Sequence, residues 1–123
     1  MIRVRKRISV EARQVWDVLV DTGAWTHWGP SVVEVEHDGA SIYAGSTGRI
    51  RLPLGQWLGF AVTDFEDGQY FRWSVAGIPA TGHRVRSLGA SESELVFEVP
   101  VWAALYALVC RRACEAIARL AES

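Results

Sequence analysis

The sequence predicts an α+β domain in which an antiparallel sheet of seven strands wraps around one long C-terminal helix. Between a short first helix and residue 99, apolar and polar residues alternate with the period of two typical of half-buried strands. From Pro100 to Leu120, apolar residues instead recur every three or four positions, as on one face of a helix. Because the sheet must cover that apolar face, we expect a shared core with a cavity between sheet and helix.

A strand and a short helix are predicted at the N-terminal end. Apolar residues alternate with arginines over the strand, at Ile2, Val4 and Ile8. Lys6 interrupts this apolar row. Ser9 is a plausible N-cap for the helix, which ends near Gly23 and buries Val15, Trp16 and Leu19. An aromatic corner, with the option of one more helical turn, follows at Trp25, His27, Trp28 and Pro30.

Six further strands are expected over residues 33–36, 49–52, 57–65, 70–75, 81–86 and 94–99. The dipeptides Asp38-Gly39 and Asp67-Gly68 mark two of the turns between them. Over residues 57–65, two apolar sets compete for the buried face, one containing Phe60 and the other Phe65. A β-bulge, which inserts one residue and reverses the alternation, could reconcile the two sets.

The C-terminal helix is predicted to begin at Pro100, because proline is well suited to the first helical position. Its apolar stripe consists of Trp102, Leu105, Tyr106, Val109, Ala113, Ala116, Ile117 and Leu120. Cys110 and Cys114 lie one helical turn apart, where the rigid helix makes a mutual disulfide unfavourable. We expect both to be reduced thiols near the edge of the stripe.

Composition limits the classes of function. The 123 residues contain no Pro/Ser-rich linker, low-complexity segment or internal repeat, which favours a single domain over residues 1–123. A formal net charge of −1 provides no field for nucleic acid or an anionic membrane. Arg3, Arg5 and Arg7 would suggest a nucleic-acid stripe only if they were considered alone. Arg51 and Arg72 are predicted on the outer face, unless a bulge turns one inward to hold a carboxylate.

The hydrophobic segments favour a cytoplasmic protein. We expect it to be a monomer or a homodimer. Residues 8–20 are interrupted by charged and polar side chains, unlike the apolar core of an export signal. The longest apolar run, residues 99–110, is about half of the ~20 residues that cross a bilayer, so no membrane insertion is expected.

Motifs of several catalytic classes are missing from the sequence. It contains no nucleophile elbow, phosphate loop or dinucleotide fingerprint. No histidine or cysteine has a spacing that would complete a metal site with Cys110 and Cys114. We therefore expect neither a metal nor another cofactor, and the sequence leaves open whether any reaction is catalysed.

The order of elements is accompanied by these motifs: Val15-Trp16, Trp25-x-x-Trp28-x-Pro30, Gly45-x-x-Gly48, Phe71-Arg72-Trp73 and Ala80-Thr81-Gly82-His83-Arg84-Val85. Together they resemble the polyketide cyclase/dehydrase-like branch of the START and birch-pollen-allergen superfamily, often called SRPBCC, over nearly the whole chain. The resemblance implies the helix-grip fold, with a deep apolar pocket between sheet and helix and with the first strand between the second and the last. In that order, Arg3, Arg5 and Arg7 would pair with the outward glutamates of both neighbours, which are Glu34, Glu36, Glu94 and Glu98. Its members include carriers of lipids, sterols or aromatic polyketides as well as true cyclases, so it implies a small apolar ligand.

His83 is the strongest candidate for chemistry, because strand alternation places it on the buried face with Thr81 and Val85. Inside a pocket it would act as a general acid or base or orient a ligand carbonyl; alternatively, it is a buried histidine with satisfied hydrogen bonds.

The other predicted site residues are mainly aromatic. Trp73 and Trp102 form either an aromatic wall that stacks a flat ligand or part of the ordinary core. The predicted ligand-binding residues, the first two of them near the mouth, are Trp25, His27, Trp73, His83, Phe97, Trp102 and Tyr106. Trp28 is predicted to pack the corner rather than to line the mouth.

Three functions follow from these observations. The first is binding or carrying a small hydrophobic or aromatic molecule. The second is a polyketide cyclase, aromatase or dehydratase in which His83 moves a proton. The third is a partner-binding domain with a filled core. Cavity volume separates the third from the others, because drug-sized ligands occupy about 300 Å³ or more and a cavity under about 100 Å³ holds little more than water.

Overall fold

The computed structural model describes residues 1–29, 31–103 and 106–123, without the side chains of Trp102 and Tyr106. The helices are α1 (Ala12–Val20), α2 (Thr22–Trp28), α3 (Tyr106–Glu122) and the short 3-10 turn η1 (Val101–Ala103). The strands are β1 (Ile2–Ile8), β2 (Glu34–His37), β3 (Thr47–Arg51), β4 (Trp57–Glu66), β5 (Tyr70–Val75), β6 (Ile78–Gly89) and β7 (Glu92–Val99). No described helix has the length and apolar character needed to cross a membrane.

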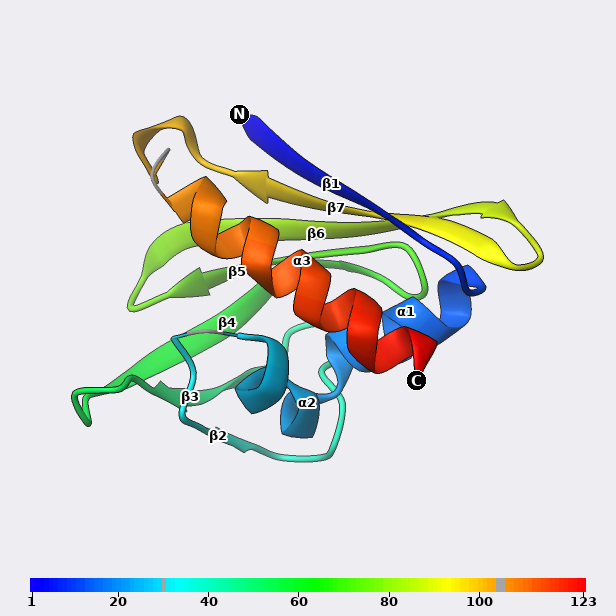
Figure 1. The fold of residues 1–123 in the computed structure, drawn as a ribbon. Helices are drawn as coiled ribbons and strands as arrows, with labels where there is room; N and C mark the ends of the chain where they lie inside the picture. Colours follow the sequence, from blue (N-terminus) through cyan, green and yellow to red (C-terminus); the bar gives the residue numbers. More distant parts are fainter. Residues whose placement is uncertain (30, 104–105) are drawn as a thin grey trace.

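The strands form one antiparallel sheet of seven strands in the order β1-β7-β6-β5-β4-β3-β2. Helix α3 lies across one face of this sheet, with α1 and α2 packed beside it (Figure 1). The apolar sides of the strands, of α1 and of α3 meet in a single core between these layers. This arrangement confirms the predicted α+β class and the helix-grip fold.

The position expected for β1 is wrong. It pairs with β7 at one edge of the sheet, whereas β2 pairs with β3 at the opposite edge. The reason is that α1 and α2 carry the chain from one edge to the other (Figure 1). The expected charge pairing therefore forms two separate ladders: β1 arginines with β7 glutamates, and β3 arginines with the β2 glutamates. Their pairs are Arg3–Glu98, Arg5–Glu94, Arg7–Glu92, Arg49–Glu36 and Arg51–Glu34.

A β-bulge in β4 resolves the two competing apolar sets. The pairing of β4 with β5 shifts between Val62 and Asp64, so that Phe60, Val62 and Phe65 all contribute to the core side. The ring of Phe65 packs edge-to-face on Trp16 at a centroid distance of 5.7 Å.

The C-terminal helix differs from its prediction in two respects. A 3-10 turn occupies Val101–Ala103, and the described α-helix runs from Tyr106 to Glu122, past the predicted end at Leu120. Leu105 lies outside the described residues, and Leu120 is 37% exposed. The buried stripe is instead rich in small side chains, which allow α3 to approach the sheet closely: Cys110, Ala113, Cys114, Ile117, Ala118 and Ala121.

The two cysteines lie within this stripe rather than at its edge. Both are free and buried, and burial raises the pKa of the Cys110 thiol to about 11 and that of Cys114 to about 12. Because the thiolate is the reactive form, these are inert core thiols at neutral pH.

The first predicted helix is divided in two. Helix α1 ends at Val20, and the Asp21 side chain caps α2 by accepting a hydrogen bond from the Gly23 backbone N–H at 2.9 Å. The residue at the N-cap position of α1 is Glu11 and not Ser9. The new boundary at Asp21 redirects the chain, so that α2 brings Trp25 and Trp28 against the sheet.

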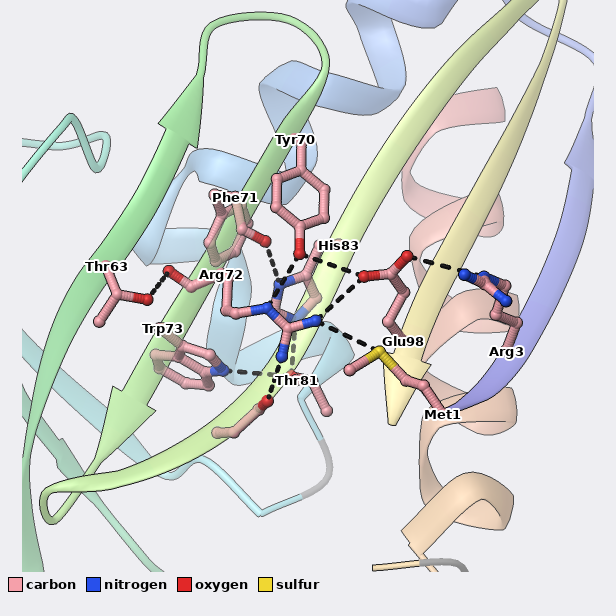
Figure 2. Close-up of polar contacts among 11 residues, drawn as sticks. Met1, Arg3, Thr63, Tyr70, Phe71, Arg72, Trp73, Thr81, His83 and Glu98 are labelled. Atoms are coloured by element: carbon pink, nitrogen blue, oxygen red, sulfur yellow. Dashed lines mark hydrogen bonds and ion pairs between the residues drawn. The ribbon is translucent and has the colours of Figure 1, made fainter. Parts of the chain in front are cut away.

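Arg72 lies on the outer face of the sheet, as predicted. Its guanidinium donates to Glu98 Oε1 at 3.0 Å and to the Tyr70 hydroxyl oxygen at 2.9 Å, and that hydroxyl in turn donates to Glu98 (Figure 2). Gly82 leaves room for this network, since a Cβ there would lie 2.7 Å from the Tyr70 oxygen. The charged side chains of β1, β5 and β7 on the outer face thus pair with one another.

Candidate functional site

Two adjoining cavities lie on the inner face of the sheet. The outer cavity, of about 360 Å³, is bounded by strands β3 to β7 and by η1. The inner cavity, of about 40 Å³, lies between α2, α3 and strands β5 to β7. The two share four lining residues: Ser31, Val32, Trp73 and Thr81. The outer cavity reaches the size of a small-molecule site, whereas the inner one has room for a single polar group or a few waters.

The lining of the outer cavity is almost entirely apolar. Apart from Ser31 and Thr81, its residues are Val32, Ile50, Leu52, Leu58, Trp73, Val75, Ala80, Val99, Pro100 and Ala103. None of the described residues that line either cavity is an aspartate, glutamate, lysine or arginine. An ionised group placed there would lose its hydration without gaining a partner, so the cavities suit an uncharged ligand.

A third hollow, of about 500 Å³, is larger but is formed differently. Its lining comes from α3 alone, at Leu108, Val109, Arg111, Arg112 and Glu115. Among the described residues, no second element contributes to its lining, and Leu108 is exposed. It is therefore a surface depression along one helix.

A chain of hydrogen bonds runs through the wall that the two cavities share. Trp73 Nε1–H donates to Thr81 Oγ1 at 3.1 Å, and Thr81 Oγ1 lies 2.8 Å from His83 Nε2 (Figure 2). His83 Nδ1 lies 3.3 Å from the backbone oxygen of Phe71. Since that oxygen can only accept, Nδ1 carries the proton of the neutral ring, and Nε2 accepts from the Thr81 hydroxyl.

His83 is held neutral by its surroundings. Its side chain is 1% exposed, and its ring stacks on Phe71 with a centroid distance of 4.2 Å. Burial lowers the pKa of His83 to about 3, with a smaller contribution from the positive charge of Arg72 on the other side of the sheet. Both ring nitrogens have partners, which matches the alternative of a buried histidine with satisfied hydrogen bonds.

Trp28 lines the inner cavity with its ring and carries an unpaired donor. Its side chain is 8% exposed, and its ring packs edge-to-face on Phe97 at 6.0 Å. Within the described part of the chain, its indole N–H is buried and has no hydrogen-bond acceptor. By contrast, Trp25 Nε1–H donates to the Leu19 backbone oxygen at 2.9 Å.

The predicted site residues are only partly brought together. Trp25, His83 and Phe97 line the inner cavity, and Trp73 lines both. The expected position of Trp25 near the mouth is wrong, because its ring is buried between Phe60 and Trp73. His27 is exposed on α2 and is absent from the described linings. The side chains of Trp102 and Tyr106 lie outside the described residues.

Sequence reasoning missed Trp28 and most of the outer cavity. Trp28 was predicted only to pack the corner, although the same indole also lines the inner cavity. Alternation within β4 and β5 offers Leu58 and Val75 as inward residues, but it does not show which end of the sheet stays open. Among the described residues, no group of three or more His, Cys, Asp or Glu side chains is placed to hold a metal ion.

Comparison with known proteins agrees with this architecture. The family described as polyketide cyclase / dehydrase and lipid transport matches residues 1–121. No curated protein matches the sequence.

Solved structures share the fold at low sequence identity. An aromatase/cyclase from a Streptomyces species is 14% identical with a TM-score of 0.74, covering 98% of this chain and 92% of its own. XoxI from Bacillus cereus is 14% identical with a TM-score of 0.72, covering 96% of this chain and 92% of its own. A point mutant of norcoclaurine synthase from Thalictrum flavum, bound to a transition-state analogue, is 12% identical with a TM-score of 0.61, covering 98% and 93%.

Proposed function

Because the chain belongs to the polyketide cyclase / dehydrase and lipid transport family, we propose that it binds one small, uncharged apolar molecule in the outer cavity. The observation that carries this proposal is a cavity of about 360 Å³ whose described lining has no charged residue. Transfer of apolar ligand surface from water to such a wall is favourable by about 25 cal/mol per Å². The volume also argues against a partner-binding domain with a filled core.

The properties of His83 favour binding over acid–base catalysis. A group with a pKa of about 3 is almost wholly in its neutral form at pH 7, so His83 lacks the imidazolium proton of a general acid and is only a weak general base. Its one free lone pair accepts from Thr81, and the Nδ1 proton is held by the Phe71 carbonyl. We therefore assign His83 to the wall of the site, where it orients Thr81. A cyclase-type reaction in this cavity would depend on how the ligand is held rather than on His83.

Tetralin, a two-ring hydrocarbon small enough for the outer cavity, tests this proposal. At ten times its dissociation constant, a ligand of the folded state adds about 1.4 kcal/mol to the free energy of unfolding. We expect the melting temperature, followed by far-UV circular dichroism, to rise by a few degrees. Val75→Trp should fill the cavity and abolish the shift, because Val75 lines it.

The matched control is Leu54→Trp, which adds the same side chain at a position that is 88% exposed. This variant should keep the full shift. If tetralin, naphthalene and a sterol all leave the melting temperature of the wild-type protein unchanged, the proposed function is wrong. An equal shift in wild type and in a folded Val75→Trp variant would place binding elsewhere.

A further inference from the structure

Exposed apolar side chains gather around the outer cavity. Leu54 is 88% exposed, Val101 65% and Ile78 54%, and Val33 is exposed as well. Each lies one or two positions along the chain from a residue that lines the cavity; in the same order, these lining residues are Leu52, Pro100, Ala80 and Val32. We call Val33, Leu54, Ile78 and Val101 the apolar rim.

The segments that carry most of the apolar rim contain no charged residue. Residues 52–63, 73–83 and 99–110 include no aspartate, glutamate, lysine or arginine. They contain the β3–β4 turn, the β5–β6 turn and the link from β7 to α3, which lie at the same end of the sheet, on the left of Figure 1. An exposed apolar patch of this kind indicates a surface that contacts something apolar outside the protein.

The charges of the chain are unevenly distributed, although they sum to only −1. At the end of the sheet opposite the rim, the exposed carboxylates of Asp64 and Glu66 precede the β4–β5 turn, and Glu92 follows the β6–β7 turn (Figure 1). The carboxylates that border the rim segments are instead neutralised, because Glu34 pairs with an arginine of β3 at 2.9 Å and Glu98 with an arginine of β5 at 3.0 Å. The acidic surface therefore lies away from the rim.

Helix α3 adds positive charge beside the rim. Arg111 and Arg112 are exposed and line the depression of about 500 Å³ together with Leu108, Val109 and Glu115. Two arginines against one glutamate give this depression an excess of positive charge. With a rise of 1.5 Å per residue, the arginines lie about 5 Å farther along α3 than Leu108, which is 63% exposed in its first turn. Apolar side chains are thus followed, one helical turn away, by cations.

We propose that the apolar rim docks onto an anionic lipid bilayer, with Arg111 and Arg112 beside the lipid phosphates. A bilayer surface combines an apolar interior with negative headgroups directly above it, which match the rim and the arginines. A second copy of the chain fits less well, because its own arginines would meet these two. Docking in this orientation turns the acidic end of the sheet away from the negative surface and the outer cavity toward the bilayer. The proposal goes beyond the proposed function, since docking requires no bound ligand.

Vesicle sedimentation tests this surface without a ligand in the cavity. The vesicles contain phosphatidylcholine with about one-third phosphatidylglycerol, and vesicles of phosphatidylcholine alone should bind more weakly. We expect wild-type protein to bind the anionic vesicles and Leu54→Glu to lower its partition coefficient at least about tenfold, because a charge replaces an apolar side chain at the interface. Arg111→Gln and Arg112→Gln should each lower it about fivefold at low ionic strength, and this effect should vanish in high salt.

The matched controls change the same residue types away from the rim. Leu88→Glu replaces a leucine that is 38% exposed at the opposite end of β6, and Arg119→Gln replaces an exposed arginine in the last turn of α3. Both variants should partition like wild type. A second readout reports the orientation: in bicelles of the same composition that carry a gadolinium-chelating lipid, the methyl resonances of Leu54, Ile78 and Val101 should broaden, whereas those of Leu88 should not.

The outcomes separate this inference from the proposed function. Equal partitioning of wild type and Leu54→Glu, or no binding of wild-type protein to the anionic vesicles, overturns the inference. If wild-type protein instead forms a dimer in sedimentation velocity that Leu54→Glu abolishes, and leaves the vesicles unbound, the rim joins two copies and the inference is wrong. Leu54 is absent from the described linings of both cavities, so its variant should keep the wild-type melting temperature and the tetralin shift. Failure of docking therefore leaves the proposed function standing.

Discussion

A chain that ends at Val99 should not fold. Truncation there removes α3, whose buried side chains face β1, β7 and the first two helices. Ile117 alone, which is fully buried, accounts for about 1.5–3 kcal/mol. The loss of α3 would also expose buried apolar residues of the shared core, which includes Leu19 and Leu95. The total stability of a domain of this size is only about 5–15 kcal/mol. We expect no near-UV circular dichroism and no cooperative thermal transition.

Substitutions within α3 provide the control for this truncation. Ile117→Ala should destabilise the protein by about 2–5 kcal/mol, whereas Leu108→Ala, at an exposed position of the same helix, should stay within about 0.5 kcal/mol. A truncated chain with a cooperative melt and a native-like near-UV spectrum would contradict the role given to α3.

The second large effect is a loss of stability in mild acid that depends on His83. Folding lowers the pKa of this histidine from 6.5 to about 3, so below pH 6.5 the unfolded chain binds a proton that the folded protein does not. The stability from burying the neutral ring is therefore complete above pH 6.5 and decreases as the pH falls toward 3. The expected loss is roughly 2 kcal/mol by pH 5 and several kcal/mol near pH 3.

Urea unfolding between pH 7.5 and 4.5 measures this effect. His83→Gln should be less stable at pH 7.5, because it disturbs the hydrogen bonds to Thr81 and Phe71, but its stability should fall less steeply toward acid. The control is His27→Gln, which changes an exposed histidine and should keep the wild-type slope. Equal slopes in wild type and His83→Gln would show that His83 is not the buried neutral group described above.

Strand alternation was sufficient to predict the inner face of the sheet. It placed Phe71 and His83 inward and Arg72 outward, and the two apolar sets in residues 57–65 signalled the bulge that β4 contains. These predictions succeeded because each depends on local geometry, in which successive side chains of a strand point to opposite faces.

Features set by packing between distant segments were not predictable. The order of β1 and β2 depends on the path of α1 and α2, and the buried stripe of α3 depends on how closely small side chains let it approach the sheet. The resemblance places the entrance of the fold at the aromatic corner, which predicts both Trp25 and His27 near the mouth. In a helix, residues two positions apart point in different directions, so Trp25 is buried and His27 is exposed.

The most direct test of the account is to locate a bound apolar molecule by NMR. Tetralin saturating the wild-type protein should give intermolecular nuclear Overhauser effects to the methyl groups of Leu52, Leu58 and Val75, which line the outer cavity. Leu108, on the exposed side of α3, serves as the internal control and should give none. Effects confined to Leu108, or no effects to the outer-cavity methyl groups at saturation, would contradict the assignment of this cavity as the ligand site.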